Sequence, residues 1–214
     1  VVSGSSVNPY DIFEEMMSEV KSITVGKLKK IIEEDSFDKR KMVKKTYFNA
    51  VSYTKGIINK IKSGEKVNVK RAKRIVESMV DHILEEEQLL VGMTAIKEYD
   101  DYTYHHSVNV SILSIALGQR LGLSRKMLTE LGMAALFHDI GKMEIPYEVL
   151  NKPTNFTDDE WMIIRKHPVW GVTALLKIKK LDNLTIRSAI VSFEHHMNFD
   201  RTGYPKIQNV LELD

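Results

Sequence analysis

Apolar residues recur along most of the chain at intervals of three and four positions, which is the spacing of one buried helix face. Short runs that carry Gly, Pro, Asn or Asp separate these stretches, and such residues favour turns and helix ends. The pattern therefore predicts an all-α protein. The predicted helices cover residues 8–34, 39–62, 68–96, 100–121, 124–137, 157–167, 169–180 and 183–195.

Several local signals set the expected boundaries of these helices. Residues 35–38 are predicted to connect the first two helices. Thr157 and Glu160 have the spacing of a capping box, and a proline after His167 is expected to end that helix. Asn183 is expected to cap the last helix. Gly132, in the middle of a helix, indicates close packing against a neighbour.

The pattern divides the chain into two regions. In residues 1–97 the apolar and methionine positions follow helical stripes, for which core packing is the favoured interpretation. The single histidine of this region, His82, stands among charged residues and is expected on the solvated surface. We expect residues 1–97 to serve packing, oligomerisation or receipt of a signal, and residues 98–214 to form a domain that carries the chemistry.

Composition narrows the possible functions. The 214 residues include no cysteine, which excludes disulfides and thiolate metal sites, and the net charge of +2 gives no argument for a nucleic-acid polymer or a membrane surface. No apolar run is long enough to span a bilayer, and no signal peptide is visible, so we expect a cytoplasmic protein without membrane insertion. The first residue is Val1 rather than Met, from which we expect a fragment end.

Histidines carry the candidate chemistry, since six of the seven lie from residue 105 onward. His138 is followed directly by Asp139, and Gly141 is expected to end the helix that precedes them. Adjacent helical side chains diverge by roughly 100°, so this pair suits one metal near a helix end, or two metals. Taken alone, the pair is weak evidence, because a capping or solvated pair is the simpler interpretation.

The other histidines change that balance. His105 and His106 are adjacent, His167 precedes a proline, and His195 and His196 end a predicted helix. Four separated histidine sites on a helical scaffold can converge in space. Imidazole and carboxylate together suit Fe, Mn or Zn, so the sequence predicts a binuclear metal site.

The order of these motifs resembles the HD-GYP family, a branch of the HD metal-dependent phosphohydrolases. The resemblance runs from about Tyr99 to Pro205. Its motifs are Tyr-Thr-x-x-His-Ser from Tyr102, His-Asp-Ile-Gly-Lys from His138, then His-Pro, His-His and Gly-Tyr-Pro. As an ordered set they are highly specific, although each one alone is not.

The resemblance implies an HD-domain helical bundle over residues 98–214, with its C-terminal part missing. It also implies hydrolysis of a cyclic dinucleotide, most often cyclic di-GMP and in some members cyclic GMP-AMP, through a hydroxide that bridges two divalent ions. Fe and Mn are the favoured ions, with Zn, Mg and Ni as alternatives. The implied metal ligands are His106, His138, Asp139, His167, His195 and His196. The implied catalytic residues are Asp139 and Lys142, and the implied substrate contacts are Lys142, Arg201, Gly203 and Tyr204.

The chain departs from the family pattern at several positions. Tyr102 stands where some members carry a carboxylate for a third metal, which favours two ions here. Met197 replaces the usual Glu, and Arg201 replaces the usual Gly. A further ligand Asp is expected beyond the Gly-Tyr-Pro loop, and Asp214 follows too closely to fill that role.

These departures keep other hypotheses open. One is a metal-loaded sensor that binds a cyclic dinucleotide with weak or no turnover. Another is a general HD phosphohydrolase for mononucleotides, against which the Gly-Tyr-Pro loop argues, and the last is a purely structural helical scaffold. The partner hypotheses are the cyclic dinucleotide, a second copy through the N-terminal helices, and a GGDEF-type or receiver partner.

Overall fold

The computed structural model describes residues 31–65, 69–96, 102–177, 182–200 and 202–206. By compactness the chain divides into Val1–Lys39 and Arg40–Asp214, and the fold below is that of the second unit. It is all-α, as predicted, and the described residues form no named strand. No helix within the described segments has both the length and the apolar character needed to cross a membrane.

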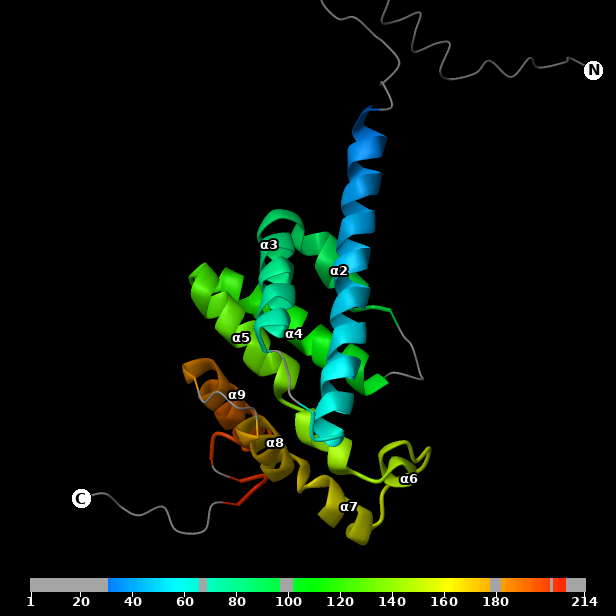
Figure 1. Cartoon of the computed structure of the whole chain (residues 1–214), viewed down its shortest axis with the longest axis vertical. Helices are drawn as coiled ribbons and strands as arrows, with labels where there is room; N and C mark the ends of the chain where they lie inside the picture. The colour runs from blue at the N-terminus through cyan, green and yellow to red at the C-terminus, as the bar shows by residue number, and fades with distance from the viewer. Residues whose placement is uncertain (1–30, 66–68, 97–101, 178–181, 201, 207–214) are drawn as a thin grey trace, which may run out of the picture. The chain divides into compact units, whose positions relative to one another are not determined.

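Eight α-helices and one 3-10 helix follow one another along the described segments (Figure 1). Their bounds are α2 Ile31–Lys62, α3 Val69–Met93, α4 Tyr102–Arg120, α5 Arg125–Phe137, η1 Ile140–Glu144, α6 Tyr147–Leu150, α7 Asp158–Ile164, α8 His167–Leu176 and α9 Asn183–Glu194.

The helices pack in two groups that meet at α5. On one side α3 packs against α4 and α5, and on the other α9 packs against α5 and α8. The short helix η1, which follows α5 directly, packs on α8. The end of α5 therefore lies where the two groups join, and this junction contains most of the residues predicted to hold metal.

Gly132 explains how closely α5 approaches its neighbours. A Cβ atom there would lie 2.7 Å from Cδ1 of Ile115 in α4 and 2.8 Å from Cγ1 of Val76 in α3. Contacts this short require a residue without a side chain, so the predicted close packing is confirmed. The buried face of α3 keeps the predicted apolar spacing, with Val76, Val80 and Ile83 among its buried residues.

The structure corrects several local predictions. Residues 35–38 continue α2 rather than connecting two helices, because Asp and Ser there lack a Gly or Pro to stop the helix. His167 and Pro168 begin α8 rather than ending α7, since proline is well tolerated in the first turn. Asp182, not Asn183, caps α9 by accepting a hydrogen bond from the Thr185 backbone N–H. The capping box of Thr157 and Glu160 is confirmed.

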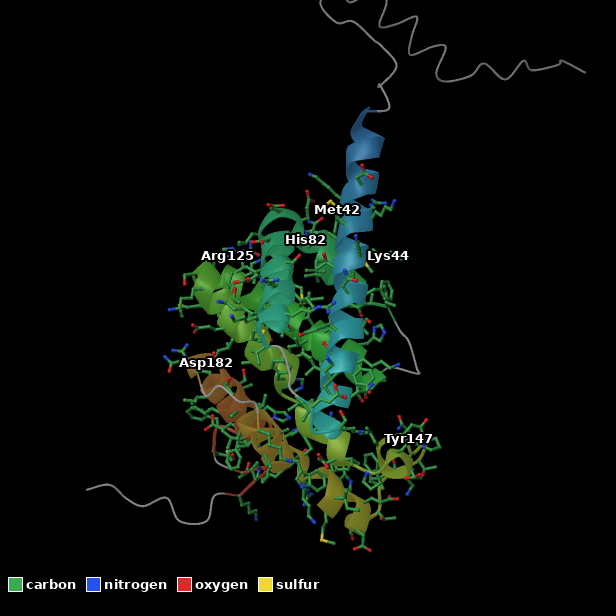
Figure 2. The ribbon with its side chains drawn as sticks, viewed as in Figure 1. Met42, Lys44, His82, Arg125, Tyr147 and Asp182 are labelled. Carbon is green, nitrogen blue, oxygen red and sulfur yellow. The ribbon has the colours of Figure 1, made fainter. Side chains whose placement is uncertain are left out.

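His82 also differs from its prediction. His82 lies on α3 (Figure 2). Its Nε2 lies 3.0 Å from Thr46 Oγ1 of α2 in a partly buried hydrogen bond, so it joins α3 to α2 and is only partly exposed to solvent. The predicted helix starts at Asn8-Pro9, Asn68 and Asp100-Asp101 lie outside the described residues.

Candidate metal centre

The centre is built around the end of α5. His138 is the C-cap of α5, with φ −54° and ψ −40°, and Asp139 precedes the first residue of η1. The carbonyl of His138 accepts a 2.9 Å hydrogen bond from Ser192 Oγ of α9, a completely buried side chain. The helix end is thus tied to α9, and both side chains occur at a helix terminus, as predicted.

Asp139 lies at the centre of the predicted ligands. Its side chain is only 2% exposed, and its two oxygens face different partners. Oδ2 is 3.1 Å from His138 Nε2 and 3.4 Å from His106 Nε2. Oδ1 is 3.2 Å from His167 Nε2 and 3.4 Å from His195 Nε2. One carboxylate therefore separates the imidazoles into two groups.

Backbone carbonyls fix the tautomer of three of these rings. Nδ1 of His138 lies 2.7 Å from the carbonyl oxygen of Ala135, three residues earlier. His167 and His195 repeat this arrangement at 2.7 and 2.9 Å, with the carbonyls of Ile164 and Ser192. A carbonyl can only accept, so each Nδ1 must carry the proton and each neutral ring presents its Nε2 lone pair to Asp139.

This arrangement leaves the centre with acceptors that face one another. Nε2 of His167 and Nε2 of His195 are 3.1 Å apart, a separation at which two lone pairs repel unless a cation lies between them. Asp139 Oδ1 is buried and makes no hydrogen bond with the described residues. A buried carboxylate oxygen without a donor is costly, so the donor set fits a bound cation.

The predicted ligands fall into two sets that share Asp139. The first set is His106, His138 and Asp139, and the second is Asp139, His167, His195 and His196, with the ligand atoms of each set within 4.8 Å of one another. Nitrogen and carboxylate oxygen are the donors that suit Fe, Mn, Zn or Ni. Each set could hold a metal ion, while metal binding and the number of ions stay predictions.

The electrostatics of the centre favour unprotonated ligands. Burial alone would raise the pKa of the Asp139 carboxyl, but hydrogen bonds from His138, His167 and His195, which these rings donate when Nε2 is protonated, outweigh burial and hold the pKa well below its usual range. Burial, reinforced by His195 and His167, lowers the pKa of His196 to about 4. Burial also lowers the pKa of His106, although Asp139 partly opposes the shift. These groups can therefore act as ligands at neutral pH.

The Gly-Tyr-Pro loop folds over His196. The rings of Tyr204 and His196 are stacked with centroids 4.5 Å apart, and the Tyr204 N–H donates to the His196 carbonyl at 3.2 Å. Gly203 has φ +91°, and a Cβ there would overlap the same carbonyl oxygen, so this turn requires glycine. Gly203 and Tyr204 thus lie beside the centre, whereas the predicted substrate contact Arg201 lies outside the described residues, as does Asp214.

Lys142 is also at the centre, but it already has a partner. Its Nζ donates to Asp139 Oδ2 at 2.7 Å, and the side chain is 24% exposed. Its predicted contact is a substrate phosphate. Lys142 is therefore close enough to the carboxylate to orient it, and exposed enough to reach a ligand, while its role stays a prediction.

Other residues at the centre were not singled out from the sequence. Ser192 is one, and Arg165 is another: its guanidinium lies 5.9 Å from the Tyr204 ring centroid and 5.7 Å from that of Trp161. Neither has a sequence signal, because a serine inside a helix and an arginine near a helix end are common. His105, expected to be structural or exposed, is buried and contacts the Tyr47 hydroxyl at 3.0 Å.

Comparisons with known proteins point to one family. The HD domain model matches residues 103–212. A cyclic di-GMP phosphodiesterase, PA4108 of Pseudomonas aeruginosa, is 37% identical over 142 residues, which are 66% of this chain and 34% of that protein. Cyclic di-GMP phosphodiesterase PdeB of Borreliella burgdorferi is 39% identical over 105 residues, 48% of this chain and 27% of that protein. This chain spans about a third of the length of these curated relatives. No solved structure matches the chain.

Proposed function

Because the chain belongs to the HD domain family and to its HD-GYP branch, we propose that it is a metal-dependent phosphodiesterase that hydrolyses a cyclic dinucleotide, with cyclic di-GMP as the favoured substrate. The observation that carries this proposal is a single buried carboxylate, Asp139, shared by two sets of imidazoles whose lone pairs face it. The names of the similar proteins support the substrate class.

In this proposal two divalent ions would be held by the two sets of ligands that share Asp139. The ligands are the six residues predicted from the sequence: His106, His138, Asp139, His167, His195 and His196. Two such ions, with Fe or Mn favoured, would supply a hydroxide nucleophile at neutral pH and offset the charge that develops on the phosphate. Side chains and backbone groups of the protein would orient the ligands and the substrate.

The chain's own residues orient the ligands and the substrate. Carbonyls at three helix ends hold the rings of His138, His167 and His195 with Nε2 directed inward. Lys142 is close enough to Asp139 to hold the carboxylate while its ammonium binds a non-bridging phosphate oxygen. Tyr204, stacked on His196, excludes water from that side of the centre. Arg201 and Gly203 complete the proposed substrate contacts.

We also propose roles for the rest of the chain. Residues 1–97 would serve packing, oligomerisation or signal reception, and residues 98–214 would carry the phosphodiesterase. A cytoplasmic location, a homodimer through the N-terminal helices and a GGDEF-type or receiver partner remain predictions that size-exclusion measurements and co-purification can test.

Metal analysis combined with a cyclic di-GMP hydrolysis assay under Fe or Mn tests the proposed function. His138→Ala and Asp139→Ala should each abolish metal retention and hydrolysis while leaving the far-UV circular dichroism spectrum nearly unchanged. His82→Ala is the matched control, because this histidine lies on α3 away from the centre and should retain metal. Hydrolysis that survives either substitution at the centre would contradict the proposal.

The same assay separates the second candidate function. Tight, metal-dependent binding of cyclic di-GMP with little turnover would identify a sensor, which the Met197 and Arg201 departures motivate. Hydrolysis of mononucleotides in preference to cyclic dinucleotides would indicate a general phosphohydrolase. A purified chain that holds no metal, and whose stability is indifferent to chelator, would leave only the structural scaffold.

A further inference from the structure

A cavity of about 160 Å³ lies directly beside the proposed metal centre. Asp139 and Lys142 line it, so it opens onto the centre, and the rest of its wall comes from the end of α2, the start of α4, the end of η1 and the segment around α6. Pockets that enclose a whole drug-sized ligand measure roughly 300–1,000 Å³. This cavity is therefore sized for part of a dinucleotide rather than for all of it.

The charge of the cavity favours an anion. Lys62, in the last turn of α2, lines the cavity and is exposed, and it makes no ion pair or hydrogen bond with the residues that the structure describes. Asp139 is the only carboxylate among the described lining residues, and Lys142 already contacts it. The lining thus has an ammonium group without a counter-charge, which suits a phosphate.

The cavity also offers aromatic surface to a base. Tyr102 is 67% exposed and Tyr147 is 76% exposed, although both rings line the cavity. Tyr102 is held in place by stacking on His106, with ring centroids 6.0 Å apart. Tyr147 projects from the start of α6 (Figure 2). Exposed tyrosines beside a cationic group are the usual platform for a stacked nucleobase.

Asn151 adds a polar group to this lining. Its Nδ2 donates to the Tyr147 carbonyl at 3.1 Å, which fixes the amide and leaves Oδ1 to accept a hydrogen bond. The N–H groups on the edge of a purine are suitable donors. The cavity therefore offers a cation for a phosphate, two aromatic rings for a base, and one hydrogen-bond acceptor for the N–H groups of a purine.

We propose that this cavity binds the half of the cyclic dinucleotide that is not being cleaved, with Lys62 on its phosphate and Tyr147 stacked on its base. The inference rests on the proposed function and extends it to residues that precede the HD match at 103–212. The end of α2 then completes the substrate site. A shift of α2 would change substrate affinity without disturbing a metal ligand.

Lys62→Met tests this role in the metal-loaded full chain. Loss of a charge-assisted hydrogen bond should weaken cyclic di-GMP binding about tenfold in isothermal titration calorimetry. The ratio of cyclic di-GMP turnover to bis(p-nitrophenyl) phosphate turnover should fall by a similar factor, because the small diester lacks a second nucleotide. Affinity should also become less sensitive to salt, a change that a purely structural role for Lys62 would not produce.

Lys60→Met is the matched control. Lys60 is exposed in the same turn of α2 but lines a different cavity, so the variant should bind cyclic di-GMP as the wild type does. Tyr147→Ala provides a second, independent test of the cavity. It should weaken binding at least fivefold through loss of stacking, and Tyr147→Phe should restore most of the affinity.

The outcomes separate the two proposals. If the wild type hydrolyses cyclic di-GMP while Lys62→Met and Tyr147→Ala bind it within twofold of wild type, the cavity is not a nucleotide subsite and the proposed function stands. If the wild type cleaves bis(p-nitrophenyl) phosphate but neither binds nor cleaves cyclic di-GMP, the proposed substrate is wrong and the subsite falls with it. Equal losses in Lys60→Met and Lys62→Met would also overturn the inference, because they would reflect general charge.

Discussion

Gly141→Ala is expected to damage the centre without removing any ligand. A Cβ atom on Gly141 would overlap the His167 carbonyl oxygen and lie 2.5 Å from the Gly171 nitrogen and 2.9 Å from the His167 carbonyl carbon. All three atoms belong to the backbone at the start of α8, so no side-chain rotation can relieve the overlap. Helix α8 would have to move away from η1 and take the His167 ring with it.

Gly141→Ala should lower the free energy of unfolding by about 3 kcal/mol. This value is at the upper end of the range for overpacked cores, because the overlapping atoms belong to the backbone. For a chain of this size that lowers Tm by roughly 6–12 °C. Displacement of a ligand's support should also weaken metal affinity by about 10- to 100-fold. Differential scanning calorimetry and metal titration of the purified variant measure both effects.

Gly56→Ala serves as the control for this substitution. Gly56 lies within α2, and a Cβ there would meet nothing within 4 Å, so the change should be neutral or stabilising by up to about 1 kcal/mol. A Gly141→Ala variant with wild-type Tm and wild-type metal content would refute the reasoning, since the contact between η1 and α8 would then not hold His167 in place.

Three further predictions concern the histidines and the ions. His105→Gln should lower stability by about 1–3 kcal/mol through loss of the buried contact with Tyr47 yet keep its metal, whereas His106→Gln should lose metal with little loss of stability; thermal melts and metal analysis give the comparison. Chelation should lower Tm, by an amount equivalent to about 2.7 kcal/mol if the free ion had been at 100 times its Kd, and re-addition of Mn or Fe should restore it. The pKa of His196 is lowered from 6.5 to about 4 in the folded chain, so the unfolded chain binds more protons between these values. Stability of the chelated protein should therefore be complete above about pH 6.5 and fall as the pH drops toward 4, and His196→Gln should flatten this dependence in melts recorded across that range.

The all-α fold could be predicted because it depends on a short-range pattern, whereas the convergence of the histidines is long-range and was expected from the resemblance of the ordered motifs to the HD-GYP family. Helical apolar spacing is a local property, and an ordered set of motifs limits which side chains can meet. The position of Asp139 between two sets of rings was also anticipated, since its two oxygens make it the natural bridge. What the sequence does not contain is the identity of the partners across helices, such as Ser192 on the His138 carbonyl.

Two of the local predictions that were wrong illustrate what a single sequence does not determine. His82 has charged neighbours in sequence, but its partner Thr46 lies on another helix and is invisible to local reasoning. His167-Pro168 was interpreted as a helix end, although proline interrupts a helix in its interior and is compatible with a first turn. For His82 the outcome was decided by the side of the helix on which packing occurs, which a single sequence does not determine.

The location of the ligands at helix ends has a common explanation. The last carbonyls of a helix lack intrahelical donors, and at α5, α7 and α9 such a carbonyl accepts the Nδ1–H of a histidine three residues later. Each bond both satisfies the helix end and turns the Nε2 lone pair toward Asp139. His106 lies inside α4, where the backbone carbonyls already accept intrahelical hydrogen bonds, and the described residues give its Nδ1 no such bond. Its side chain is 35% exposed, which makes it the most exposed imidazole in contact with Asp139. If two ions bind as proposed, the ion held by the set that contains His106 should therefore exchange faster, in a metal-exchange measurement, than the ion held by the set that contains His167 and His195.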